Sequence, residues 1–435
     1  MPAGALRDPP DTTQVSGLLR MTRDAVAPHM HGAIHHSLVN LSSEIHACFL
    51  ISVYSVYELP SLAFRTRRLH FGRSMQRASP PALNHRRRFD LPPTMPSTTR
   101  LADGTELPLP GFGAMGMSFA YGEKNDEQSK KTLRKAIELG CTVWDTADMY
   151  GRGHNEQIIG EVLREGENRK KVFLIDKFGN RWDDEKKSFY VDGSPEWTIE
   201  ALDQSIKHLG GLYPDAYLLH RVDKRTPIEQ TVRALDALRK EGKTKYIGLS
   251  ECSAETLRRA AKEATIDFVE VEYSPWELVM ERNGVLDACK ELGIKVLAYS
   301  PLGRGFLTGR YKSAEDFKKD GDFERLTRYW NSRQNWPRLT EENFQKNYKI
   351  VEEFERLAAK KGCKPSQLAL AWLMAQGDHI IPIPGTKSEK YLVENFAARD
   401  IELSQAEIDE VRKVIDDNAP VGDRYPAGAM AALDQ

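Results

Sequence analysis

The chain has 435 residues, of which 40% are hydrophobic and 29% are charged, with a formal net charge of −1. This composition is typical of a globular protein and indicates no overall preference for nucleic acid or for a membrane surface. The most apolar run near the start, at 47–57, is much shorter than the ~20 residues that a membrane-spanning helix needs. The five cysteines are far apart, which predicts a reduced, cytoplasmic protein without a structural metal.

Residues 1–94 differ in composition from the rest. They contain 11 arginines, six acidic residues and no lysine, a net charge of +5 that leaves −6 for the remainder. They show no sustained helical or strand period, and proline pairs interrupt them at 80–81 and 92–93. We expect this segment to be a mostly disordered extension, and a single domain to occupy residues 95–435.

From residue 99 onward the pattern becomes regular. Arg100–Leu109 contains Asp103-Gly104, a turn signal that predicts a hairpin. Short apolar runs then alternate with amphipathic segments. The predicted strands are Gly111–Met115, Thr142–Asp145, Val172–Lys177, Ala216–His220, Tyr246–Leu249, Phe268–Tyr273, Lys295–Tyr299 and Ile380–Pro384. The predicted helices are Asp126–Leu139, Asn155–Arg164, Glu196–Leu209, Ile228–Glu241, Ala254–Ala264, Gly284–Leu292, Pro365–Gln376, Ser388–Ala398 and Ser404–Asp416.

Eight strands that alternate with helices indicate parallel β/α units. Eight units over about 320 residues favour an α/β fold of the (β/α)₈ TIM-barrel type. The predicted barrel carries an N-terminal hairpin and an insertion, Gly309–Arg338, after strand seven. An open doubly wound sheet is the alternative. The insertion is rich in charged and aromatic residues, and both a surface excursion and a lid over the active face remain open.

Polar residues end three consecutive predicted strands. These are Asp145, Lys177 and His220, and Tyr150 follows in the loop after the first of them. Each has an aliphatic residue two positions earlier, so the three side chains are expected to point into the mouth of the barrel. Catalytic residues of such barrels stand at the C-terminal ends of the strands. Single residues of these types are usually structural, but four complementary groups together indicate a catalytic site.

The chemistry of the four groups is coherent. A tyrosine has a reference pKa near 10, and an adjacent ammonium stabilises its phenolate. Asp145 is expected to hold Lys177 charged and oriented. Tyr150 is then suited to act as a general acid toward a carbonyl oxygen, which His220 can also contact. Asp148, the second carboxylate of the loop, has no predicted catalytic role.

The segment Gly111–Gly116 fits the spacing of a dinucleotide-binding fingerprint. That motif requires a helix directly after the glycine turn. Here residues 118–123 precede any helical pattern. We therefore interpret the segment as the first barrel strand.

In its motifs the chain resembles the aldo-keto reductase family from about Thr99 to Asp416, most closely the fungal-type branch that includes pyridoxal reductases and other aldehyde reductases. The motifs are Gly111–Gly116, Trp144–Gly151, Lys177 after an apolar strand, Leu218–Arg221, Gly248–Glu251, Val271–Pro275, Ala298–Gly309, Ile383–Lys387 and Glu394-Asn395.

The resemblance implies an NADPH-dependent reductase of aldehydes or ketones, with a tetrad of Asp145, Tyr150, Lys177 and His220 and with Tyr150 as the proton donor. It also implies the cofactor contacts, in which Gly113 and Met115 would line the nicotinamide end. Tyr299 would stack on the nicotinamide, Ser250 and Glu270 would hold its carboxamide, and the loop Ser300–Gly309 would wrap the pyrophosphate. The remaining implied contacts are Leu302, Gly303 and Gly305 in that loop, and Gly385, Thr386, Lys387, Lys390, Glu394 and Asn395 around the adenosine.

Three positions depart from the pattern of many family members. Glu270 stands in place of glutamine, Glu251 in place of asparagine, and Tyr391 in place of arginine. Lys387 and Lys390 still supply positive charge for a 2′-phosphate, which favours NADPH over NADH. Trp276 is a candidate wall of the substrate pocket. The expected partner is a small carbonyl compound; the alternative function is a cofactor-binding regulatory barrel with little turnover, of the kind that serves channels.

Overall fold

The computed structural model describes residues 97–119, 124–186, 188–319, 336–430 and 433–434. All of them belong to one compact unit, His85–Gln435. The predicted disordered extension, 1–94, lies outside the described residues. Within these ranges no helix is both long and apolar enough to cross a membrane. The cysteines within them are free thiols: Cys141, Cys252, Cys289 and Cys363.

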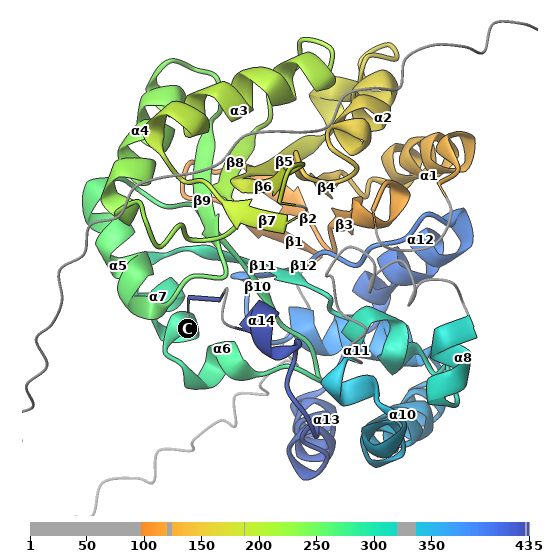
Figure 1. Cartoon of the computed structure of the whole chain (residues 1–435). Helices are drawn as coiled ribbons and strands as arrows, with labels where there is room; N and C mark the ends of the chain where they lie inside the picture. The colour runs from red at the N-terminus through yellow and green to blue at the C-terminus, as the bar shows by residue number, and fades with distance from the viewer. Residues whose placement is uncertain (1–96, 120–123, 187, 320–335, 431–432, 435) are drawn as a thin grey trace, which may run out of the picture. The chain divides into compact units, whose positions relative to one another are not determined.

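Eight parallel strands form the centre of the fold (Figure 1). They are β3 (Phe112–Gly113), β4 (Val143–Asp145), β5 (Phe173–Phe178), β8 (Ala216–Leu219), β9 (Tyr246–Ser250), β10 (Phe268–Glu272), β11 (Lys295–Tyr299) and β12 (Ile380–Pro382). Neighbours in the sheet are also consecutive within this set. Each overlaps one predicted strand, because the apolar runs between turn signals mark the strands that are buried on both faces.

The first and last strands meet. The backbone N–H groups of Gly111 and Gly113 donate to the carbonyls of Pro382 and Pro384, at 2.9 and 3.2 Å. Gly113 also forms a parallel bridge with Gly385. These bonds join the edges of the sheet, so the predicted (β/α)₈ barrel is confirmed and the open doubly wound sheet is wrong.

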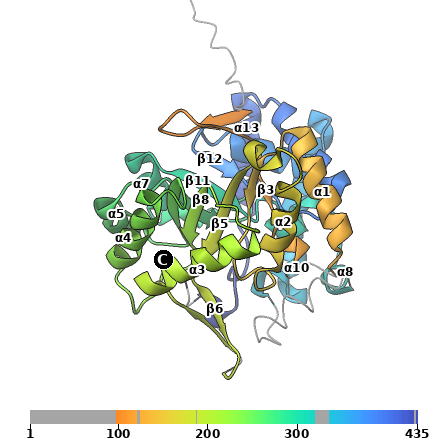
Figure 2. The same cartoon turned by 90° about the horizontal axis from the view of Figure 1, so that it is seen from above.

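Helices surround the strands, as the view in Figure 2 also shows. Those that overlap predicted helices are α1 (Asp126–Leu139), α2 (His154–Leu163), α3 (Pro195–His208), α4 (Ile228–Lys240), α5 (Ala254–Glu263), α7 (Val285–Leu292), α11 (Pro365–Met374), α12 (Glu389–Phe396) and α13 (Gln405–Asp417). Short additional helices are α6 (Val279–Arg282), α8 (Ala314–Lys319) and α14 (Ala427–Met430).

Capping explains why the predicted helix boundaries are close to the observed ones. The side chain of Asn125 accepts a hydrogen bond from the backbone N–H of Gln128 at the start of α1. Gly140 ends that helix with a φ of 80°, in the left-handed region that glycine adopts without strain. Ser404 and Glu407 form a reciprocal capping box at the start of α13.

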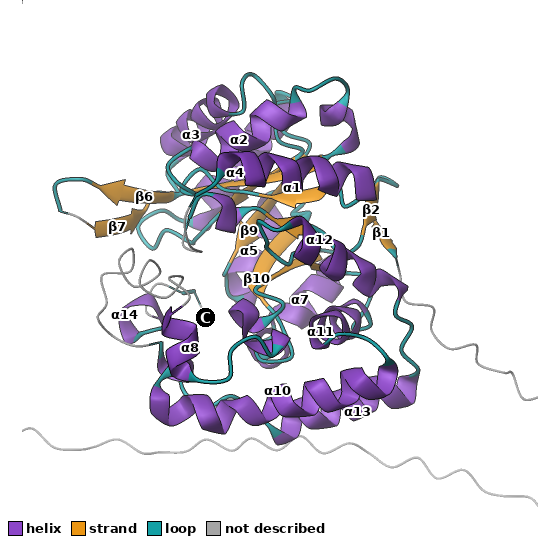
Figure 3. Cartoon of the chain, turned by 90° about the vertical axis from the view of Figure 1, so that its right-hand side faces the viewer, coloured by secondary structure: helices purple, strands orange, loops and turns teal. Residues whose placement is uncertain are grey.

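The predicted N-terminal hairpin is β1 (Thr98–Arg100) with β2 (Glu106–Pro108). It lies at one end of the barrel, and a second hairpin projects from the opposite end (Figure 3). Leu107 and Leu109, from and just after β2, are buried in one cluster with Leu218 and Phe268 of the barrel strands. The hairpin therefore closes the end of the barrel that is opposite the candidate catalytic side chains.

Two larger structural features were not predicted. The second hairpin, β6 (Asn180–Asp183) with β7 (Ser188–Val191), follows β5. The helix α10 (Glu341–Lys361) follows a 3-10 turn, η4 (Pro337–Leu339). Within the insertion Gly309–Arg338, the structure describes α8 and the start of η4, and residues 320–335 lie outside the described ranges.

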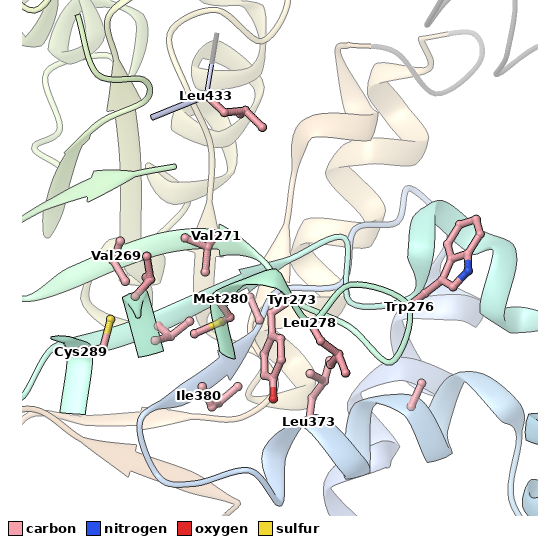
Figure 4. Close-up of a cluster of buried hydrophobic side chains, with 14 of the residues drawn as sticks. Val269, Val271, Tyr273, Trp276, Leu278, Met280, Cys289, Leu373, Ile380 and Leu433 are labelled. Atoms are coloured by element: carbon pink, nitrogen blue, oxygen red, sulfur yellow. The ribbon is translucent and has the colours of Figure 1, made fainter. Parts of the chain in front are cut away.

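One face of β10 packs against the surrounding helices. Figure 4 shows Val269 and Val271 of β10 in a buried cluster with Met280 of α6 and Cys289 of α7. The alternate residues Phe268 and Glu270 face the barrel interior, because side chains alternate along a strand. The outer packing of Val269 and Val271 thus turns Glu270 toward the barrel interior.

Gly160 provides a test of how α2 packs against the end of α3. A Cβ atom at Gly160 would lie 2.6 Å from the carbonyl oxygen of Leu209, at the end of α3. We expect Gly160→Ala to lower the free energy of unfolding by about 1–3 kcal/mol through overpacking. The matched control is Gly428→Ala in α14, where nothing lies within 4 Å. Helix propensity alone would stabilise both variants, so equal or raised stability of Gly160→Ala in urea unfolding would contradict the assigned contact.

Candidate active site

Asp145 ends β4, and the loop that follows it is anchored to the neighbouring strand. The backbone N–H groups of Thr146 and Asp148 donate to the carbonyls of Ile175 and Lys177, both at 2.9 Å. Asn155 of α2 accepts from the hydroxyl of Thr146 at 2.6 Å. These bonds hold the loop in place, so the position of Tyr150 is set by the barrel rather than by a free loop.

Lys177 lies at the centre of a buried ionic cluster. Its Nζ donates to Oδ2 of Asp145. The same Nζ lies 3.2 Å from Oε2 of Glu270. The lysine side chain is fully buried and both carboxylates are 4% exposed. The predicted Asp145–Lys177 pair is thus present, and Glu270 joins it as a second carboxyl that the sequence analysis assigned only to the cofactor.

Burial and neighbouring charges both shift the pKa values of these groups. Burial disfavours the ammonium, but Asp145 and Glu270 outweigh it and raise the pKa of Lys177, so the lysine stays charged. Burial raises the pKa of Asp145, against the lowering effect of Lys177. Burial and the charge of Asp145 raise the pKa of Glu270 to about 8.

Tyr150 lies beside Lys177 and His220. The lysine Nζ is 5.3 Å from the centroid of the Tyr150 ring. The imidazole of His220 meets that ring edge-on at 5.9 Å, and Phe119 stacks on it at 6.3 Å. The structure therefore brings together all four side chains of the predicted tetrad.

The tyrosine and the histidine are both held in their neutral forms. Burial raises the pKa of Tyr150, and the lowering effect of Lys177, which the sequence analysis expected, is opposed by Asp145 and Glu270. Burial, with the positive charges of Arg221 and Lys177, lowers the pKa of His220 well below its usual value. A neutral phenol is a proton donor, and a neutral imidazole can donate a hydrogen bond without carrying charge.

The other carboxylate of the loop, Asp148, has a different environment. Burial and the nearby Glu156 raise the pKa of Asp148 well above its usual value. One of its carboxyl oxygens is buried without a hydrogen-bond partner among the described residues. The absence of a catalytic role for Asp148 stays a prediction.

The residues predicted to hold the nicotinamide occupy adjacent strand ends. Ser250 of β9 is directly opposite Glu270 of β10, and Tyr299 of β11 is opposite Glu272. Arg221 donates to the hydroxyl of Ser250 at 3.3 Å. Gly113 ends β3 and is the register partner of Asp145 in β4, and Met115 follows two residues later. The 3-10 turn η1 (Met115–Met117), not an α-helix, follows β3, as the barrel interpretation of the glycine motif expects.

The loop after β11 has the backbone of an anion-binding turn. Ser300, Gly303, Arg304 and Gly305 have φ values of 49°, 55°, 58° and 89°. Gly303 and Gly305 lie in the 3-10 turn η3 (Gly303–Thr308), for which Leu302 is the preceding residue. Neighbouring residues with left-handed backbone conformation can point their N–H groups to the same side. Such an arrangement of N–H groups can bind a phosphate.

Trp276, the candidate pocket wall, supports this loop. Its indole stacks on Phe306 with the ring centroids 4.2 Å apart, and only 5% of the residue is exposed. A Cβ at Gly303 would lie 3.0 Å from the Trp276 ring. Figure 4 shows Trp276 set apart from Val269 and Val271 of the buried cluster. A substrate contact through Trp276 remains a prediction.

The residues predicted to surround the adenosine follow β12. Gly385 is exposed and bridges to Gly113, and the hydroxyl of Thr386 accepts from the N–H of Ser388. In α12, Glu394 accepts a hydrogen bond from Ser366, while Asn395 is buried. Lys390 is exposed and Lys387 is half-buried. Both lysines lie in the short stretch between Gly385 and Tyr391.

Sequence reasoning missed Arg424 and Tyr425, which reach the site from beyond α13. Arg424 donates to both carboxylate oxygens of Glu251, at 2.6 and 3.4 Å. The hydroxyl of Tyr425 lies 2.9 Å from that of Tyr299, which in turn donates to Glu251. The signal for this segment was weak, since an Arg-Tyr pair beyond the last predicted helix has no periodicity.

Tyr425 also contacts the loop after β11, through Arg304. The guanidinium of Arg304 lies between two aromatic rings, 3.8 Å from the centroid of Trp336 and 4.7 Å from that of Tyr425. It also pairs with Glu272 at 3.1 Å. The position of the candidate phosphate loop therefore depends on contacts from the end of the described chain.

The aldo/keto reductase family model matches residues 111–416. The chain belongs to the aldo/keto reductase family. Among curated proteins, this aldo/keto reductase is 45% identical over 337 residues to "Aldo-keto reductase yakc [NADP(+)]" of Schizosaccharomyces pombe, covering 77% of this chain and 96% of the relative. It is also 45% identical over 335 residues to an aldo-keto reductase of Gibberella moniliformis, covering 75% and 96%.

A solved structure agrees with the fold of this aldo/keto reductase. A glycerol dehydrogenase from Gluconobacter oxydans matches with a TM-score of 0.65 and 27% sequence identity, covering 74% of this chain and 96% of that one. The resemblance stated from the motifs is thus confirmed at the level of the family.

The Arg424–Glu251 pair predicts a measurable stability effect. Burial opposes ionisation of Glu251, but Arg424 and Arg221 outweigh it and lower the pKa of Glu251. We expect Arg424→Ala to lower the free energy of unfolding by about 3–5 kcal/mol, because it leaves a buried carboxylate without its partner. Adding Glu251→Gln should restore part of the loss. Strictly additive effects in the double-mutant cycle would contradict the pairing.

Proposed function

We propose that this aldo/keto reductase reduces an aldehyde or ketone to an alcohol with NADPH, and that Tyr150 is the proton donor. The observation that carries the proposal is the convergence of Asp145, Lys177 and His220 around the buried phenol of Tyr150. The name of the Schizosaccharomyces pombe relative, which includes NADP(+), supports the choice of cofactor.

The residues fit an NADP cofactor by their chemistry. Gly303 and Gly305 have positive φ values and carry no side chains, so the backbone of this loop is accessible at two positions. At Gly385 a Cβ would lie 3.2 Å from the carbonyl oxygen of Gly113. Lys387 and Lys390 place positive charge after β12, which suits a 2′-phosphate. Ser250 and Glu270 would hold the carboxamide, and Tyr299 would stack on the ring. When bound, NADPH supplies the hydride.

Each member of the tetrad has a separate task. Tyr150 donates its phenolic proton to the carbonyl oxygen as that oxygen gains negative charge. Lys177, which Asp145 keeps in place, stabilises the phenolate that results. The neutral imidazole of His220 donates a hydrogen bond to the same oxygen and orients the substrate. In the reverse direction the Tyr150 phenolate accepts the proton.

Tyr150→Phe tests the assignment of the proton donor. The variant keeps the ring that packs on Phe119 but removes the acidic proton, so we expect kcat for an aldehyde panel to fall about 10²–10⁴-fold. NADPH binding, followed by quenching of protein fluorescence, should be retained. If wild type and variant both bind NADPH and are equally inactive, the chain is a cofactor-binding regulatory barrel instead of an enzyme.

Lys387→Ala tests the cofactor preference. We expect the KM for NADPH to rise about tenfold, which corresponds to about 1.4 kcal/mol, because a charge-assisted contact to the 2′-phosphate is lost. NADH lacks this phosphate, so its KM should not change and serves as the internal control. A parallel rise for both cofactors would place Lys387 away from the 2′-phosphate.

A further inference from the structure

Glu270 has a position that a cofactor contact alone does not explain. In the barrel, β9 and β8 lie between β10 and β5. Glu270 nevertheless meets Lys177 of β5 across the barrel interior, at 3.2 Å. Its carboxyl therefore belongs to the same buried cluster as the predicted catalytic side chains.

The cluster contains two carboxyls for one ammonium. Both carboxyls face the same Lys177 Nζ, and Oε2 of Glu270 has no hydrogen-bond partner among the described residues, which is costly for an ionised group. Two buried carboxylates also repel each other, which disfavours ionisation of both. The other titratable groups that face Glu270 are Tyr150, which is neutral, and Arg221, which is charged.

Of the two carboxyls, Glu270 is the one that can keep a proton. Lys177 donates directly to Asp145, so the carboxylate form of Asp145 has the stronger partner. The pKa of Glu270 near 8 agrees with this assignment, since a carboxyl with that value is protonated at neutral pH. The neutral-pH cluster is therefore Asp145 ionised, Lys177 charged and Glu270 protonated, with no net charge.

We propose that Glu270 is the internal proton source that restores Tyr150 after each reduction. The proposal rests on the proposed function, because it requires Tyr150 to be the proton donor. A glutamine, which many family members have at this position, cannot perform this task because its amide has no proton to release at neutral pH.

The proton movements balance. Tyr150 first gives its phenolic proton to the alkoxide oxygen of the product and becomes a phenolate. Lys177 then passes one of its protons to the phenolate oxygen, and Glu270 returns a proton to the Lys177 amine. The negative charge moves from the phenolate to the Glu270 carboxylate. An oxidised, cationic nicotinamide held by Ser250 and Glu270 would stabilise that carboxylate. A proton from solvent then restores Glu270 after release of NADP⁺.

The proposal makes a prediction about binding that is independent of turnover. Binding of the cationic NADP⁺ ring should favour the Glu270 carboxylate, so about one proton should be released per NADP⁺ bound near pH 7. NADPH has a neutral ring and should release none. Titration calorimetry of the whole chain in two buffers with different ionisation enthalpies measures this number directly. By linkage, the Kd for NADP⁺ should fall about tenfold per pH unit as the pH rises toward 8.

Three variants identify the source of the proton. Glu270→Gln should release no proton and should give a Kd for NADP⁺ that does not change with pH. Asp267→Asn removes a carboxyl with a raised pKa from the start of the same strand, at the other end of the barrel, and should behave as wild type. Tyr150→Phe should retain the release, although its turnover is lost.

The outcomes separate the two proposals. Loss of proton release in Tyr150→Phe, with retention in Glu270→Gln, would assign the proton to Tyr150 and overturn the role of Glu270. Absence of release in the wild type would overturn it as well, even if Glu270→Gln did not fold. Full activity of Tyr150→Phe would instead refute the proposed function, whatever the calorimetry gives.

Discussion

The buried contact of Lys177 with two carboxyls is the interaction on which the rest of the site depends. An ammonium without a partner in a protein interior costs several kcal/mol, and two full carboxylates around it would leave an excess negative charge. Asp145 supplies one carboxylate by a direct hydrogen bond, and Glu270 supplies a group that can hold or release a proton. Together with burial, the negative charge of these carboxyls raises the pKa of Tyr150 and keeps its phenol protonated.

The barrel supports this cluster with a layer of apolar side chains. Val143, Ile175, Leu218, Phe268 and Leu297 are fully buried, each two residues before a polar residue of the site. On β9 the corresponding residue is Gly248, where a Cβ would lie 2.5 Å from the carbonyl of Phe268. The polar groups of the site therefore lie against a close-packed apolar layer. This layer excludes water from the barrel interior and strengthens the electrostatic interactions of the site.

The tetrad could be predicted because it follows from a local pattern, in which alternation along a strand places Asp145 and Lys177 on the face of Val143 and Ile175. The contact of Glu270 with Lys177 could not be predicted in this way, since Lys177 lies on β5, which is not a neighbour of β10. The helix α10 was not predicted, although its sequence carries a helical signal. Its buried side chains are spaced by three or four residues, at Phe344, Tyr348, Val351 and Phe354. Arg424 contacts Glu251 over 173 residues of sequence, and no local pattern reveals such a pair.

That separation also affects how the protein is made. During translation Glu251 leaves the ribosome long before Arg424, and its carboxylate then lacks the guanidinium that hydrogen-bonds to it. A buried carboxylate without its hydrogen-bonded partner is costly. The packing around Glu251 is therefore complete only after Arg424 and Tyr425 have been synthesised.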